Sequence, residues 1–355
     1  MSETSIMTPV PKNNKSTISD VARLAGVSKK TVSRVINNSP KVDANTRENV
    51  LKVITTLNYV PSPQARGLAA RRSFLIGLIY DNPNPLYIDS VQRGILKICG
   101  PAGYELVVHP CDIRREGFLA DILRFISRSH VDGVVILPPV SELNHVSQAV
   151  HDAGCPYVRL AAAAVTDESH RIVVSDERAA VRKLVEYLIE LGHRRIGFIS
   201  GPTGYLSASE RFEGFSEAHR KYGIAFDPEL KMEGAYSFES GKSCTQRLLS
   251  LQNRPTAIFA SNDDMAAGAI HVAVEMGFKV PENLSIAGFD DSSVASLILP
   301  TLTTIRRPVM QMSSLAAEKL INAIDGAGTI QSSVEGIIAP EVIVRNSTGA
   351  YPKTS

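Results

Sequence analysis

Short apolar runs recur along most of the chain at intervals of about 25 to 30 residues, with helix-like stretches between them. They lie at 74–80, 104–109, 131–137 and 157–160, and again at 195–200, 257–260 and 284–289. Strands that alternate with helices in this way are typical of βαβ units, in which helices cover both faces of a parallel sheet. Two groups of such strands predict an α/β body with two parallel sheets, one in each of two lobes.

Polar side chains lie within or just after several of these predicted strands, where ligands of open α/β sheets bind. Carboxylates, amides and guanidinium groups there supply the donors and acceptors that sugar hydroxyls or a carboxylate need. The candidates are Asp81, Asn82, Asn84, Tyr87, Arg159, Arg211, Asn262, Asp263, Asp290 and Asp291. Asp or Asn after a strand also often caps the next helix, and we favour this role for Asn84, Asp264 and Asp291.

The first 73 residues differ in charge from the rest of the chain. They hold 12 Lys and Arg against 4 Asp and Glu, a net charge of +8, whereas the whole chain carries +2. A basic head on an acidic body suggests a domain that binds a polyanion. A basic, solvated arm without a partner is the alternative that charge alone leaves open.

The pattern of the basic head predicts three helices. Thr17 and Asp20 form a capping-box variant, Gly26 ends the first helix, and Ser28 and Asp43 begin the second and third. The residues expected to face inward are Val21, Leu24, Ala25, Val32, Val35, Ile36, Val50, Leu51, Ile54 and Leu57. Two short helices joined by a glycine turn, the second basic at its start, are typical of a helix-turn-helix.

Cationic and hydroxyl side chains at the start of the second helix suit a DNA surface. Lys29, Lys30 and Arg34 can donate to guanine or to phosphate, and Thr31 and Ser33 can bond either. A three-helix bundle with a solvated cationic face remains the alternative at this point.

A weak helix is predicted directly after the head. Ser62 as the cap and Pro63 at the first helical position form a strong start. The segment is short and contains Gly67, and helices under about 12 residues are marginal alone. It is either a hinge that folds on a partner or a linker with a fortuitous cap.

The run from Ile18 to Asn38 (ISDVARLAGVSKKTVSRVINN), the segment 57–61 and the Gly67-Leu68-Ala69 ending resemble the lactose/galactose repressor (LacI/GalR) family of transcriptional regulators. The segments 210–215, 261–263 and 288–291 resemble the ligand-site signatures of that family. The resemblance extends from about residue 17 to about residue 346. It implies a helix-turn-helix head followed by a two-lobed, periplasmic-binding-protein-like core.

The resemblance also implies domain boundaries. It places a tail at 1–16, the DNA-binding head at 17–61, a hinge at 62–73, the first lobe at 74–174 with 305–337, and the second lobe at 175–304 with 338–355. Thr301–Ile305 resembles the third crossing between the lobes, and a final strand pair is expected near Glu341–Val344. The tail after Arg345 lacks leucine heptads, so we expect a homodimer rather than a tetramer.

Roles for individual residues of the head and hinge follow from the resemblance. Lys29, Lys30 and Arg34 match base-reading positions, and Leu68 matches a leucine that wedges into the minor groove. The other matched DNA-binding positions are Ser28, Thr31, Ser33, Asn37, Tyr59, Ser62 and Ala65. The implied partner is double-stranded operator DNA.

The resemblance implies a small-molecule effector between the lobes, with a mono- or disaccharide favoured. The matched effector-binding residues are Asp81, Asn82, Tyr87, Arg159, Arg211, Asn262, Asp263 and Asp290. We favour a sugar that acts as an inducer and releases the protein from DNA. A purine-like or sugar-phosphate corepressor, which strengthens DNA binding, is the alternative. A sugar-binding protein or an enzyme on the same core is a remote alternative.

Several classes of protein are disfavoured by the sequence. No run of about 18 apolar residues exists to span a membrane, the N-terminus lacks the apolar core of a secretory signal, and four scattered cysteines fit the cytoplasm, where we expect the protein at the nucleoid. The stretch Ser240–Ser243 echoes a nucleotide-binding loop, but Tyr236 stands where that motif has glycine. No metal or nucleophile motif is present, and we expect no cofactor, no metal and no catalysis.

Overall fold

The computed structural model describes residues 16–36, 39–59, 72–82, 84–163, 169–326 and 337–351. The chain divides into two compact units, Met1–Phe74 and Leu75–Ser355. The described secondary structure of the first unit is helical, and all described strands belong to the second. The small unit contains the basic head, and the larger unit is the α/β body.

Local capping signals set the ends of the head helices, which are α1 (Ile18–Ala25), α2 (Lys29–Ile36) and α3 (Ala44–Thr56). Thr17 and Asp20 form the predicted capping box, and Gly26 ends α1 at φ 66°, a left-handed conformation that glycine adopts without steric cost. The side chains of Ser28 and Asp43 accept hydrogen bonds from backbone N–H groups at the starts of α2 and α3. The predicted helix starts are thereby confirmed.

One face of each head helix contributes to a small apolar core. Its buried members are Val21, Ala22, Ala25, Val32, Val35, Val50 and Tyr59. Leu24 and Leu51, which we expected to face inward, are exposed, so that prediction is wrong for these two. Successive helical residues are turned by about 100° from one another, and both leucines lie outside the arc that Val21, Ala25 and Val50 bury.

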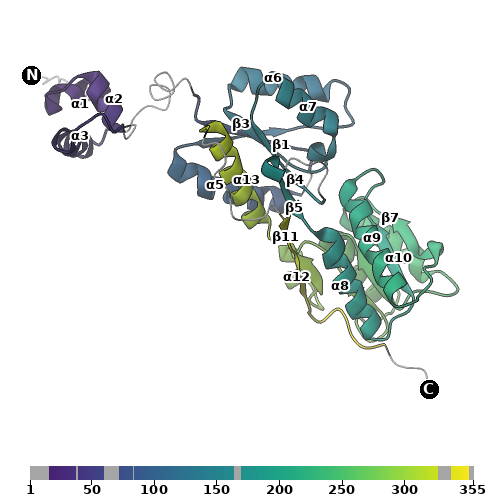
Figure 1. Ribbon diagram of the computed structural model, residues 1–355. Coiled ribbons are helices and arrows are strands. Elements are labelled where there is room, and N and C mark those ends of the chain that lie inside the picture. Colours follow the sequence, from purple (N-terminus) through teal and green to yellow (C-terminus); the bar gives the residue numbers. More distant parts are fainter. Residues whose placement is uncertain are drawn as a thin grey trace, which may run out of the picture. The chain divides into compact units, whose positions relative to one another are not determined.

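The first lobe of the body is a six-stranded parallel sheet in the order β11-β5-β4-β3-β1-β2. Its strands are β1 (Leu75–Tyr80), β2 (Glu105–Pro110), β3 (Gly133–Ile136), β4 (Tyr157–Ala161), β5 (Ile172–Ser175) and β11 (Ile337–Ile338). Its α-helices are α5 (Pro85–Ala102), α6 (Phe118–Ser129), α7 (Asn144–Asp152) and α13 (Val309–Ile324), with 3-10 turns η1 (Val140–Glu142) and η2 (Ser169–Arg171). Helices α6 and α7 cover one face, and α5 and α13 cover the other (Figure 1).

The second lobe contains a four-stranded parallel sheet in the order β7-β6-β8-β9 and an antiparallel pair, β10-β12. The strands are β6 (Ile196–Ser200), β7 (Lys231–Glu233), β8 (Ala257–Ala260), β9 (Ser285–Ala287), β10 (Thr304–Arg306) and β12 (Glu341–Ile343). The helices are α8 (Glu177–Glu190), α9 (Leu206–Lys221), α10 (Phe238–Leu249), α11 (Asp263–Glu275) and α12 (Ser293–Leu297), with the 3-10 turn η3 (Pro228–Leu230). The two parallel sheets confirm the predicted fold class.

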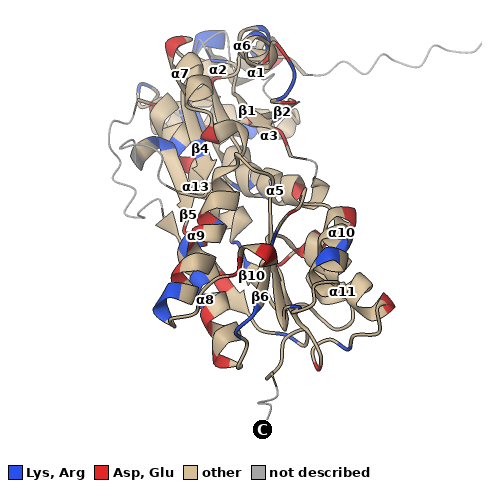
Figure 2. Ribbon diagram, turned by 90° about the vertical axis from the view of Figure 1, so that its right-hand side faces the viewer, with Lys and Arg blue, Asp and Glu red and all other residues tan. Residues whose placement is uncertain are grey.

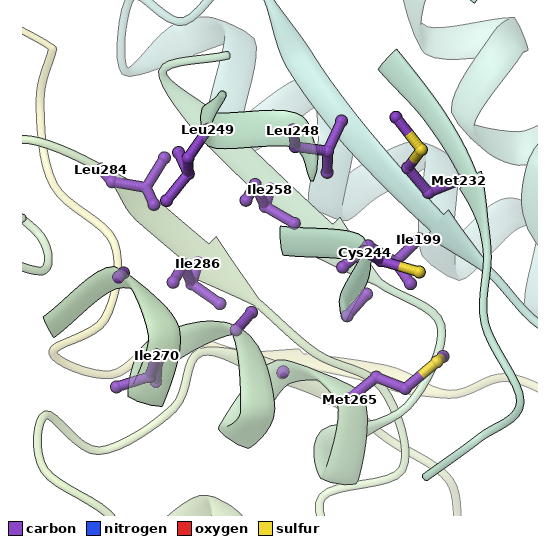
Figure 3. Close-up of a cluster of buried hydrophobic side chains, with 14 of the residues drawn as sticks. Ile199, Met232, Cys244, Leu248, Leu249, Ile258, Met265, Ile270, Leu284 and Ile286 are labelled. Atoms are coloured by element: carbon purple, nitrogen blue, oxygen red, sulfur yellow. The ribbon is translucent and has the colours of Figure 1, made fainter. Parts of the chain in front are cut away.

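Helices cover both faces of the second sheet. Helices α10 and α11 enclose one apolar cluster with the sheet (Figure 3), and α8 and α9 enclose the other. Ion pairs join α8 to α9: Arg178 lies 2.9 Å from Glu210, and Arg182 lies 3.3 Å from Glu217. Positions of both charge signs occur along these two helices (Figure 2). The sheet is therefore buried on both sides, as a parallel sheet requires.

Gly241 in the stretch that echoes a nucleotide-binding loop has a packing role. It lies inside α10, where an added Cβ would collide with the backbone of Met265 in α11. Gly268 of α11 meets the backbone of Phe238 in the same way. The two glycines let α10 and α11 approach closely, and this accounts for Gly241 without any nucleotide.

The chain passes between the lobes at more than one place. It enters the second lobe between β5 and α8, returns between β10 and α13, and crosses again between β11 and β12. The segment Thr301–Ile305 leads into β10 and so precedes the return to the first lobe. Its assignment to the third crossing is wrong, because that crossing follows β11. The predicted final strand pair is β10 with β12.

Candidate nucleic-acid and ligand sites

Helix α2 has two chemically distinct sides. Val32 and Val35 are buried in the head core, whereas Lys29 and Lys30 are exposed and Arg34 is half-buried. No carboxylate in the described part of the chain lies within ion-pair distance of these three cations. Their charge is therefore available to an anionic partner, and a DNA duplex is one that fits a helix of this kind.

The remaining DNA-binding candidates differ in how the structure places them. Ser28 is exposed, and its hydroxyl lies 2.9 Å from that of half-buried Thr31. Ser33 is half-buried on α2, and Tyr59 is buried among the apolar residues of the head core. Asn37, Ser62, Ala65 and Leu68 lie outside the described residues.

Arg211 of α9 is buried and is the one cation among the second-lobe candidates. Its Nε donates to Oε2 of Glu177 at 2.7 Å, and its Nη1 donates to the carbonyl of Ser261. Its guanidinium carbon lies 3.8 Å from the centroid of the Phe289 ring, a cation–π contact. Burial alone lowers the pKa of Arg211, but the negative charge of Glu177, together with smaller contributions from Tyr236 and Asp290, outweighs it and the net pKa is raised. The guanidinium is thus fixed at the carboxyl edge of the second sheet.

Glu177 and Arg307 extend this ion pair into a network that spans the junction of the lobes. Arg307 Nε lies 3.3 Å from Oε1 of Glu177, and Arg307 Nη1 donates to Asp290 at 3.4 Å. The Arg307 guanidinium also lies 5.4 Å from the ring centroid of Tyr87 in α5. Burial raises the pKa values of Tyr87 and Asp290. Three predicted effector residues, Tyr87, Arg211 and Asp290, therefore belong to one network.

Asn262 and Asp263 are engaged within the second lobe. Asn262 caps α11 by accepting from the Met265 N–H at 2.9 Å, and its Nδ2 donates to the Tyr236 carbonyl. Asp263 accepts from the Thr304 hydroxyl at 2.6 Å and from the Ser292 N–H at 2.7 Å. Burial, with a smaller contribution from Asp290, raises the pKa of Asp263 to about 8.

The first-lobe candidates hold loop backbone in place. Asp81 accepts from the Ile113 N–H at 3.0 Å, and Asn82 accepts from the Asn84 N–H at 2.8 Å. Arg159 is buried in β4 and donates to the Ser141 carbonyl. The structure does not bring these three into the network around Glu177.

The capping roles that we favoured for three residues have mixed outcomes. Asn84 caps α5, as expected, and its Nδ2 reaches Asp264 of the other lobe at 3.4 Å. Asp264 lies inside the first turn of α11, so its capping role is wrong because Asn262 occupies the cap. Asp291 makes ion pairs with Arg306 at 2.7 Å and Arg345 at 2.6 Å instead of capping a helix.

Sequence reasoning missed Glu177, Arg307, Tyr236 and Glu142. Glu177 follows β5, a strand of only four residues that we did not predict. Arg307 follows β10, and its position after a strand was the signal that could have identified it. Tyr236 stacks with Tyr205 at a centroid distance of 6.2 Å beside Arg211. All of these assignments required the strand ends to be known.

Metal sites and membrane-spanning helices are both absent from the described part of the chain. No group of three or more His, Cys, Asp or Glu there is placed to hold a metal ion. None of the helices in that part of the chain combines the length and the apolar character needed to cross a membrane.

Comparison with known proteins places the chain in a family. The model for bacterial regulatory proteins of the lacI family matches residues 17–62, and that for the periplasmic binding protein-like domain matches residues 185–348. The chain is 32% identical to a probable HTH-type transcriptional repressor, ExuR, from Bacillus subtilis (strain 168), over 93% of this chain and 98% of the relative.

Two solved structures resemble the whole chain. The transcriptional regulator CelR–cellobiose complex is 30% identical with a TM-score of 0.71, covering 94% of this chain and 99% of that one. The lac repressor dimer bound to operator and the anti-inducer ONPF is 29% identical with a TM-score of 0.77, covering 95% and 100%. These matches confirm the resemblance inferred from the sequence. The chain therefore belongs to the LacI family of bacterial regulatory proteins and is a transcriptional regulator with a helix-turn-helix head and a periplasmic-binding-protein-like core.

Proposed function

We propose that this regulator represses transcription by binding a palindromic operator as a homodimer, and that a mono- or disaccharide bound between its lobes releases it. The observation that carries the proposal is the exposed cationic side of α2. Lys29 and Lys30 project from a helix whose opposite side, Val32 and Val35, is buried in the head. A helix anchored in this way can enter a major groove with its N-terminal turn leading.

In this proposal, Lys29, Lys30 and Arg34 read bases, while Ser28, Thr31, Ser33, Asn37 and Tyr59 contact phosphate or position the helix. Ser62, Ala65 and Leu68 belong to a hinge that sits in the minor groove between the half-sites. The effector-binding residues are Asp81, Asn82, Tyr87, Arg159, Arg211, Asn262, Asp263 and Asp290. We propose the domain boundaries that the family resemblance implies, moved by one or two residues so that β5, β10 and β11 each stay within one lobe.

The charge balance of the inter-lobe network supports a neutral ligand. The guanidinium groups of Arg211 and Arg307 are matched by the carboxylates of Glu177 and Asp290. A phosphate-bearing ligand would bind better where cations are in excess, whereas paired donors and acceptors suit sugar hydroxyls. The similar CelR structure is a complex with cellobiose, and this also favours a sugar.

Exposed leucines on the second lobe support a dimer. Leu297 and Leu299 are 78% and 85% exposed and lie close together at and after the end of α12. Adjacent apolar side chains this exposed favour a protein–protein contact. We assign a second copy of the chain as the occupant, because the similar lac repressor structure is a dimer.

Ligand control of DNA binding requires that the sugar bind the two conformational states unequally. We propose that sugar binding changes how the first lobes of the two subunits pack against each other. The new packing separates the hinges of the two subunits and so disfavours the DNA-bound state. The protein would act in the cytoplasm, where the DNA lies, and we expect it to leave the sugar chemically unchanged.

Fluorescence anisotropy of a labelled palindromic duplex tests the proposal. The duplex comes from DNA upstream of the gene or its neighbours, and protein is titrated at two salt concentrations before a panel of mono- and disaccharides, nucleobases and sugar phosphates is added. We expect tight, sequence-dependent binding that one sugar reverses. A compound that strengthens binding would replace the inducer with a corepressor, and weak binding that salt abolishes on every duplex would contradict the DNA-binding function.

A further inference from the structure

Glu142 connects the two lobes directly. It ends the turn η1 of the first lobe, where Val140 and Ser141 are buried and the Ser141 hydroxyl donates to the Leu160 carbonyl at 2.6 Å. Glu142 Oε2 accepts from the backbone N–H of Leu206 at 2.9 Å, and Leu206 is the first residue of α9 in the second lobe. The side chain thus extends from a rigid turn of one lobe to a helix of the other.

Helix α9 lacks a cap of its own. Tyr205 at the cap position makes no side-chain hydrogen bond to the helix, and no acidic residue lies in the first turn. The first N–H groups of a helix need acceptors, and a negative charge is favoured at this end by the helix dipole. Glu142 supplies the acceptor from the other lobe, and it supplies the charge when it is ionised; burial raises its pKa to about 7. The start of α9 is therefore capped only when the lobes are together.

The capped end of α9 is also the end nearest the proposed effector residue. Arg211 lies in the second turn of α9, and the Ser207 hydroxyl in its first turn lies 3.4 Å from that of Tyr236. A shift of this helix start changes where Arg211 lies relative to the first lobe.

The second oxygen of Glu142 differs from the first in its hydrogen bonding. Oε1 is buried and accepts no hydrogen bond from the residues that the structure describes. A buried acceptor left unpaired is unfavourable, and a hydroxyl of a bound sugar would satisfy it. A phosphate at this point would meet a like charge whenever Glu142 is ionised.

We propose that Glu142 is a positioning residue that caps α9 across the lobes and accepts a sugar hydroxyl with its free oxygen, so that effector binding and lobe closure reinforce each other. This inference rests on the proposed function, because it takes the inter-lobe face as the effector site. It adds a specificity element, since the buried oxygen of Glu142 accepts a hydroxyl donor and, in its ionised form, disfavours an anionic group.

Hydrogen–deuterium exchange of the full-length protein tests the cap without requiring a known effector. We expect the backbone amides of residues 205–208 to exchange at least about threefold faster in Glu142→Ala than in the wild type, and Glu142→Gln to restore part of the protection because its amide oxygen still accepts. Glu116→Ala changes an exposed glutamate of the same lobe and serves as the matched control. Equal exchange in the wild type and a folded Glu142→Ala would overturn the proposed cap.

The effector response supplies the second readout. With the sugar that releases wild-type protein from the duplex, we expect the midpoint of release to rise about tenfold in Glu142→Ala and less in Glu142→Gln, with Glu116→Ala unchanged. Tenfold corresponds to about 1.4 kcal/mol, the scale of one hydrogen bond to a charged group. An unchanged midpoint would refute the effector role. If no sugar releases the wild type, the proposed function fails, while the exchange experiment still decides whether the cap exists.

Discussion

Arg211 donates to Glu177 across 2.7 Å, and the two side chains are only 4% and 1% exposed. Glu177 opens α8 directly after the crossing from the first lobe, and Arg211 lies on the neighbouring helix α9. The pair therefore links the start of α8, where the chain enters the second lobe, to α9. Arg211 on α9 is also a proposed effector residue. Ion pairs this buried are held in one geometry, because breaking one leaves a charge without solvent.

Glu177→Gln removes the negative charge that both Arg211 and Arg307 face. Two buried guanidinium groups then share only Asp290, so we expect the free energy of unfolding to fall by about 3 to 5 kcal/mol. Urea denaturation followed by circular dichroism measures this loss. Glu186→Gln on the same helix is the control, because its partners Arg182 and Lys221 are substantially exposed and its effect should stay within about 1 kcal/mol.

Lys30→Ala tests whether α2 reads bases. If Lys30 contacts a guanine, binding to the preferred operator should weaken by about 1 to 3 kcal/mol, with little change on duplexes altered at that base pair. Anisotropy titrations on the operator and its single-base variants measure both. An equal loss of affinity on all duplexes would instead assign Lys30 to a phosphate contact. The slope of log affinity against log salt concentration should then fall by about one.

Arg211→Met tests the effector site separately from the head. We expect operator binding to persist and release by the inducing sugar to be lost, because the buried donor at the carboxyl edge of the second sheet is gone. Thermal unfolding accompanies the anisotropy measurement, since Glu177 loses one of its two cationic partners. A folded variant that is still released at the wild-type sugar concentration contradicts the assignment.

Parts of the fold with local causes could be predicted from the sequence. The capping box at Thr17, the turn at Gly26 and the caps at Ser28 and Asp43 depend on residues within about one helical turn. The long parallel strands were visible as apolar runs. Strands β5, β7 and β11 were not predicted. Strand β7 has three residues, of which Lys231 and Glu233 are charged and exposed, and β11 has only two. Length alone does not account for β5, because β3 and β8 have four residues as well and were visible.

The composition of the inter-lobe network depends on topology rather than on local pattern. Glu177, Arg211, Asp290 and Arg307 meet because the chain crosses the lobe junction repeatedly, and no local spacing encodes that meeting. The family resemblance identified Arg211 and Asp290 as candidates but gave no reason to pair them with Glu177. Asn262 is a different case. The family resemblance assigns it to ligand binding, whereas its local role in the structure is to cap its own helix, α11.

Asp263 should make stability depend on pH. Burial raises its pKa to about 8 from an ordinary value of 3.8, so between these values the folded state holds a proton that the unfolded state has released. The free energy of unfolding therefore falls as pH rises through this window, by at most about 1.4 kcal/mol per pH unit for one group. We expect Asp263→Asn to flatten the fall in urea titrations between about pH 5 and pH 8. If the free energy of unfolding depends on pH in the same way in the wild type and in the variant, Asp263 is not the group responsible.

Leu299→Glu tests the proposed dimer surface. A charge at a side chain that is 85% exposed in one chain should cost little in folding but would be buried against the second copy, where an unpaired charge is strongly unfavourable. We expect sedimentation velocity to show monomers at concentrations where the wild type is dimeric. Operator affinity should fall with dimerisation, because a monomer contacts a single half-site. Met276→Glu changes another exposed apolar residue of the same lobe and should leave the dimer intact; dissociation in both variants would mean that the leucine surface is not the specific contact.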